Sequence, residues 1–191
     1  MRKIRSGSYG EIRSLFSTVT YALCAMTLSA LTVYPEALAI LTPSEYHDAL
    51  GAIYPLALSV IPVFLANAVM SGESYFERGG VSSLSAILTA VVTAALSILL
   101  IPRTSYITAG VITLFSYTTL AFLNSAIFKR LSGEYPFKRR NIVIALSLSV
   151  AYSLIIYSFK DSIIARAVLL LPVLPLLLVL SLKIYRTVKE K

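Results

Sequence analysis

The run that decides the fold is residues 79–102, which read GGVSSLSAILTAVVTAALSILLIP and carry no charged side chain. A helix of about 20 apolar residues is long enough to cross the hydrocarbon core of a bilayer. The run exceeds that length, has glycine only at its start and has proline only at its end. We therefore expect residues 79–102 to form a membrane-spanning helix.

Five further runs have the same character, so we expect the chain to cross a membrane six times. The expected spans are residues 14–35, 49–71, 80–102, 104–128, 141–159 and 163–185. Lipid offers no hydrogen-bond partner to the backbone, which favours helices, and the runs lack the short alternating strands of a membrane β-barrel. The predicted fold class is all-α, a polytopic membrane protein with a single transmembrane domain over residues 1–191.

The composition of the whole chain agrees with this prediction. Hydrophobic residues make up 57% of the chain and charged residues 14%, against about 45–50% and about 25% in soluble domains. These proportions exclude a disordered chain, most soluble enzymes and a nucleic-acid-binding module with a charged surface. We therefore expect no nucleic acid among the partners.

The distribution of basic residues predicts the orientation. If there are six spans, fourteen of the 17 Lys and Arg residues lie on the side that holds both chain ends, and only Arg103, Lys160 and Arg166 lie opposite. Basic residues concentrate on the cytoplasmic side. We therefore expect both termini to be cytoplasmic, in the cell membrane, with anionic lipid headgroups near the basic loops.

The inventory of reactive side chains is small. One cysteine, Cys24, and one histidine, His47, leave no basis for a disulfide framework or for a metal site with several histidines. The middles of the expected spans contain no ionisable residue. Arg166 and Lys183, near the two ends of the last span, are long enough to reach the headgroups. We expect no catalytic residue, no metal and no cofactor, so the chain is not predicted to be an enzyme.

Two amides and several prolines interrupt the apolar spans. Asn67 and Asn124 each lie near the cytoplasmic end of a span, where a buried amide is expected to hydrogen-bond a neighbouring helix or a ligand. Prolines at positions 55, 62, 172 and 175 are expected to kink their helices. Freed backbone carbonyls at such breaks can also line a pathway.

The expected cytoplasmic loop after the second span reads SGESYFERGGVSSL over residues 71–84. In a helix, Glu73, Glu77 and Gly80 would share one face, which suits a short surface segment that docks a soluble partner. The alternative is a plain turn whose glycines end one helix and begin the next. The residues alone do not separate these two interpretations.

This loop resembles the coupling segment of ABC-2 type permease subunits, which have six spans with both ends inside. The resemblance rests on Glu73, Glu77, Arg78, Gly79 and Leu84, and on an entry segment similar to residues 9–16, YGEIRSLF. The layout is also similar to that of the haem-exporter B subunit. The segment between the last two expected spans, residues 160–162, is shorter than is usual in the family.

The resemblance implies a partner and a docking site. A separate cytoplasmic ATPase subunit would bind at Glu73, Glu77, Arg78, Gly79 and Gly80, and a second permease subunit, identical or related, would complete the membrane domain. The alternative hypothesis is a non-catalytic structural subunit of a larger membrane complex. A lipid-modifying enzyme would need a cluster at the membrane face, for which only Glu73, Glu77 and Glu134 are available.

Overall fold

The computed structural model describes residues 9–43, 51–75, 79–133, 135, 137, 139–159 and 162–189. Every regular element among these residues is helical. Along the described residues lie the α-helices α2 (Tyr9–Leu41), α3 (Ile53–Tyr75), α4 (Gly79–Leu100), α5 (Tyr106–Ser132), α6 (Arg139–Ser158) and α7 (Ile163–Lys189), with the short 3₁₀ helix η2 (Ile101–Arg103) between α4 and α5.

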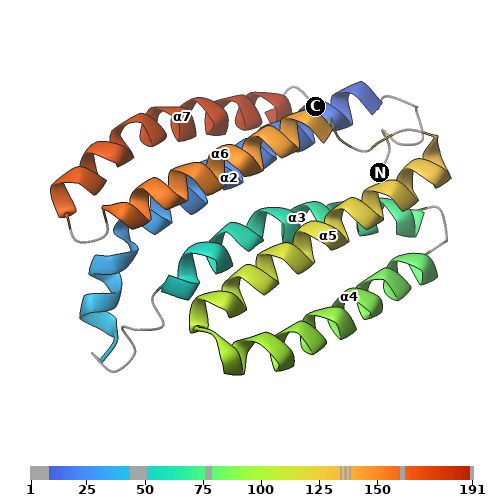
Figure 1. Cartoon of the computed structure of the whole chain (residues 1–191). Coiled ribbons are helices and arrows are strands. Elements are labelled where there is room, and N and C mark those ends of the chain that lie inside the picture. Colours follow the sequence, from blue (N-terminus) through green and yellow to red (C-terminus); the bar gives the residue numbers. More distant parts are fainter. Residues whose placement is uncertain are drawn as a thin grey trace.

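All six α-helices are long and apolar enough to cross a membrane, which confirms the predicted all-α fold with six spans. Figure 1 shows that α2 begins and α7 ends at the same end of the bundle, as an even number of crossings requires. We call this the proximal end, and we call the opposite end, where α3, α5 and α7 begin, the distal end. That the proximal end faces the cytoplasm remains a prediction from the basic residues.

The helices form two groups of three (Figure 1). In one group α2 packs on α6 and α7, and in the other α5 packs on α3 and α4. Contacts between the groups run through α2 with α3 and, more lightly, α3 with α6, whereas α5 and α6 barely touch. A single cluster of buried apolar residues nevertheless extends through both groups.

The most extensive contact between two helices is that of α3 with α5. Gly110 of α5 faces the start of α3, where a Cβ atom would lie 2.5 Å from the carbonyl oxygen of Ala52 and 2.6 Å from the ring of Pro55. Small residues let membrane helices approach closely in this way. Gly110 therefore sets the separation of α3 and α5 at the distal end.

Helix α2 is longer than the sequence predicted. We expected the first span to end at Pro35 and Glu36 to begin a loop, but α2 continues to Leu41. Proline removes one helical hydrogen bond and bends a helix without necessarily ending it, and residues 36–41, EALAIL, include good helix formers. Figure 1 shows the distal part of α2 bent away from the rest of the helix.

Two of the six helices stand out for their low burial within the chain. Helices α4 and α7 are the most hydrophobic of the six spans and are also the least buried, and α4 is almost entirely exposed. A soluble protein would bury such helices. Apolar side chains are at no disadvantage on the outside when lipid surrounds them, so this pattern is typical of a multi-pass membrane protein.

Candidate functional site

A partly buried ion pair joins α7 to the bent part of α2 at the distal end. Arg166, on the first turn of α7, is only 3% exposed. Its guanidinium donates to both carboxylate oxygens of Glu36, with Nη1 2.9 Å from Oε2 and Nη2 bonded to Oε1. Nη1 also lies 3.2 Å from the carbonyl oxygen of Thr32. This two-pronged geometry is the strongest form of an arginine–carboxylate pair.

Two expectations from the sequence were wrong here: that Arg166 reaches the headgroups and that Glu36 begins a loop. Arg166 was expected to extend to the headgroups, but it turns inward and is buried, because Glu36 lies on a helix and faces it. Glu36 itself is partly open, since its side chain is 37% exposed. Unpaired arginine is costly in a membrane, so Arg166 pairs with Glu36, and with its bond to Thr32 it holds α7 against α2 on both sides of Pro35.

Three tyrosines cross the boundary between the two helix groups. The rings of Tyr34 on α2 and Tyr54 on α3 meet edge to face with centroids 6.5 Å apart, and Tyr54 meets Tyr157 of α6 in the same way at 5.2 Å. Edge-to-face pairs of this kind stabilise aromatic contacts beyond the area they bury. The row therefore ties α2, α3 and α6 together near the distal end.

A cavity of about 340 Å³ lies beside this row, between α3, α5 and α6. Its lining is overwhelmingly apolar and has no charged side chain; the lining residues are Gly51, Tyr54, Pro55, Leu58, Ile107, Val111, Leu114, Val150, Ser153, Leu154 and Tyr157. Ligand pockets typically measure about 300–1,000 Å³ and are mostly apolar. The volume thus falls at the lower end of the range for a small ligand.

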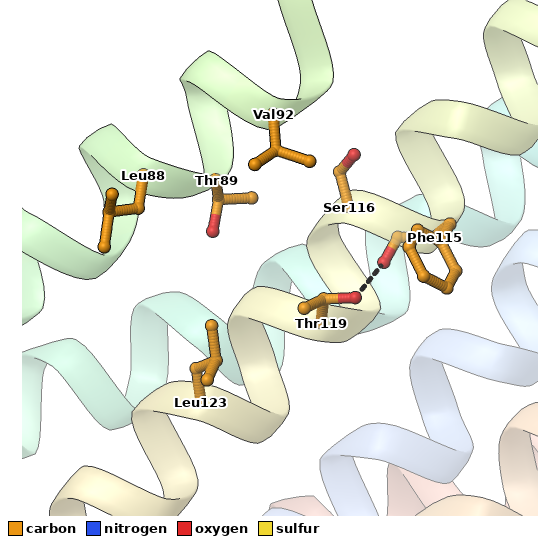
Figure 2. Close-up of a pocket in the computed structure, with 7 residues that line it drawn as sticks. All are labelled: Leu88, Thr89, Val92, Phe115, Ser116, Thr119 and Leu123. Atoms are coloured by element: carbon orange, nitrogen blue, oxygen red, sulfur yellow. Dashed lines mark hydrogen bonds between the residues drawn. The ribbon is translucent and has the colours of Figure 1, made fainter. Parts of the chain in front are cut away.

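A smaller pocket of about 120 Å³ separates α4 from α5. Figure 2 shows the side chains of Leu88, Thr89 and Val92 on α4 across from those of α5, among them Ser116 and Thr119. Thr119 donates back to the carbonyl oxygen of Phe115 on its own helix at 2.9 Å. The pocket has no charged group and is too small for most ligands, so we assign it no function.

The two amides singled out from the sequence lie in different environments. Asn124 on α5 is fully buried, and its Oδ1 accepts a 2.6 Å hydrogen bond from Ser85 of α4, while its Nδ2 has no partner among the described residues. Asn67 is exposed on α3 rather than buried between helices. Only Asn124 therefore joins two helices of the chain.

The predicted docking segment is divided between two helices. Glu73 lies in the last turn of α3, while Gly79 and Gly80 begin α4. Glu77 and Arg78 lie outside the described residues. Residues 73–75 and 79–80 therefore belong to two long helices, the first three to α3 and the last two to α4. Both helix ends lie at the proximal end (Figure 1).

The sequence reasoning missed both the ion pair and the cavity. Nothing in the spacing of Glu36 and Arg166, 130 residues apart, predicts their contact, although a lone arginine inside an apolar run could have prompted a search for an acidic partner.

Among the described residues, no group of three possible metal ligands occurs. No family model, curated protein or solved structure matches the chain.

Proposed function

We propose that the chain is the membrane-spanning permease subunit of an ABC-type transporter in the cell membrane, driven by a separate cytoplasmic ATPase. The proposal starts from the resemblance of residues 73–84 to a coupling segment. It assigns the docking of the ATPase to Glu73, Glu77, Arg78, Gly79 and Gly80. A second permease subunit would complete the transporter.

The observation that carries the proposal is the position of α3. This helix packs against α2, α4, α5 and α6, so it contacts both helix groups. It ends at Tyr75, and α4 begins at Gly79, so only residues 76–78 lie between the two helices. A partner that moved these residues would act directly on the helix that joins the two groups.

The arrangement of the helix groups also supports movement. Few contacts link the groups compared with those inside each group, and α5 and α6 barely touch. Inter-element contacts of limited extent permit relative motion. A push on the proximal end of α3 could therefore change the separation of α5 and α6 at the distal end.

The test is association with an ATPase. We would purify the chain from its native membrane in mild detergent and identify the bound polypeptides by mass spectrometry. We expect a protein with a P-loop motif whose ATP hydrolysis depends on the complex. The double variant Glu77→Ala/Arg78→Ala should reduce its retention at least tenfold, whereas Lys189→Ala, which removes a charge from the end of α7, should not.

Two results would contradict the proposal. One is retention of the ATPase by the Glu77→Ala/Arg78→Ala variant at the level of the unaltered chain. The other is purification with redox subunits and no nucleotide-binding chain. That second result would instead favour the alternative, a structural subunit of a larger membrane complex.

A further inference from the structure

We propose that the cavity between α3, α5 and α6 is a binding site for one hydrocarbon chain of a membrane lipid. The inference goes beyond the proposed permease function and does not depend on an ATPase. It rests on where the cavity opens, on what lines it and on how the space between α5 and α6 is filled at the proximal end.

The cavity opens sideways, toward the space that lipid occupies. Its floor consists of buried side chains, Tyr54 and Leu58 of α3 and Ser153 of α6, whereas Val111 of α5 and Leu154 of α6 at its mouth are exposed. Val111 and Leu154 belong to the apolar outer surface of two spanning helices. The lining is thus continuous with the surface that faces the bilayer.

The chemistry of the lining selects an apolar occupant. No charged side chain lines the cavity, so a headgroup has no counter-ion there. Along α5 the lining runs from Ile107 to Leu114, a length of about 10 Å at 1.5 Å per residue. One leaflet of the hydrocarbon core is about 15 Å thick. The lining therefore has room for about two thirds of the length of a single chain from the adjacent leaflet.

The proximal end of the same cleft shows how the protein fills space when it does so itself. There Phe137, from the connection between α5 and α6, is buried against Leu65, Phe122 and Ile142, and only about 10 Å³ remains. The distal end has no such side chain among the described residues. Interiors are close-packed, and mobile hydrocarbon at the open mouth can enter and restore the missing contacts.

Photolabelling can test the inference with the intact chain. The chain would be reconstituted in phosphatidylcholine vesicles that contain a phosphatidylcholine with a photoactivatable diazirine in the middle of one acyl chain. Peptide mass spectrometry would then locate the adducts. We expect adducts on Tyr54 and Leu58 at the cavity floor, at least fivefold above those on Ile61 and Leu65, which are also buried on α3 but lie nearer the proximal end.

A matched pair of variants separates the cavity from the general lipid surface. Val111→Trp places a large side chain at the mouth, and Val91→Trp makes the same change on exposed α4, outside the cavity; the two valines are 51% and 61% exposed. Val111→Trp should lower labelling of Leu58 several-fold, and Val91→Trp should leave it unchanged. Leu154→Trp, on the opposite wall, serves as the second variant if Val111→Trp does not fold.

Two outcomes would overturn the inference. One is labelling of Leu58 no stronger than that of Leu65 in the unaltered chain. The other is unchanged labelling of Leu58 in correctly folded Val111→Trp and Leu154→Trp. The vesicles contain no ATPase and no nucleotide, so either result leaves the permease proposal to its own test, and failure of that test leaves the cavity result standing.

Discussion

The cleft between α5 and α6 is closed by a protein side chain at its proximal end and left open at its distal end. Phe137, one of the largest fully buried side chains, occupies the proximal end, whereas a cavity of about 340 Å³ remains at the distal end. The difference follows from the connections. The chain crosses from α5 to α6 at the proximal end and brings Phe137 with it, but no connection joins these helices distally.

The two ends also differ in what holds the helices together. Apolar packing around Phe137 closes the proximal end, while the Arg166–Glu36 pair and the row of tyrosines connect helices at the distal end. Charge pairs and aromatic edges fix neighbouring helices without filling every space between them. The distal end can therefore be both held together and hollow.

The strongest test of this comparison removes the side chain that closes the proximal end. Phe137→Ala should lower the free energy of unfolding by about 3–5 kcal/mol, because it opens a cavity in a packed site. Cys24 is the single cysteine and is buried, so a thiol-reactive dye reports unfolding on heating. Phe159→Ala, at a half-exposed site, is the control and should cost much less. Equal effects would contradict the assigned role of Phe137.

The ion pair is the corresponding test at the distal end. Glu36→Gln should destabilise the chain by about 3 kcal/mol, because it leaves the buried guanidinium of Arg166 without its counter-charge. Arg166→Met should cost less, since the carboxylate left behind is partly exposed. The double variant should be more stable than the sum of the two losses, as a double-mutant cycle would show. Additive losses would mean that the pair is not coupled.

Because α3 and α5 approach closely at Gly110, glycine-to-alanine changes at Gly110 and at Gly80 should shift the stability in opposite directions. Gly110→Ala should destabilise the chain by about 1–3 kcal/mol, because the new methyl group meets the backbone of Ala52. Gly80→Ala meets nothing within 4 Å and should be neutral or stabilising by up to about 1 kcal/mol through helix propensity. Thermal unfolding followed at Cys24 compares the two directly. Stabilisation by Gly110→Ala would show that the helices can separate at no cost.

The smallest expected effect concerns the bond between α4 and α5. Ser85→Ala removes the donor to Asn124 and should cost about 0.6–1.7 kcal/mol, between the mean and the maximum measured for hydrogen bonds between membrane helices. Ser97→Ala, also on α4 but without a described bond to another helix, should change stability little. A loss as large as that of Phe137→Ala would mean that α4 depends on this bond and not on lipid.

The sequence predicts the helices far better than their contacts. The lengths of the hydrophobic runs suffice to place six spans. A run of that length in lipid must be helical, because its backbone groups find hydrogen-bond partners only within the helix. The loop expected from Glu36 onward was wrong, because Pro35 bends α2 without ending it and the helix continues to Leu41. Apolar runs are apolar on all sides, so they do not reveal which face meets another helix.

The candidate sites illustrate the same limit. Asn124 could be singled out as an amide in an apolar run, but its partner Ser85 is one of many serines. Arg166 was visible in the sequence, yet its burial depends on Glu36, which the sequence placed in a loop. The cavity depends on the divergence of α5 and α6 and on the position of Phe137, and neither is encoded in a local pattern.

The location of α2's start and α7's end at one end of the bundle has a practical consequence (Figure 1). Two copies of the chain can be joined head to tail by a short soluble linker, and both will insert with the same orientation. With such a tandem gene, a substitution can be introduced into only one of the two linked copies.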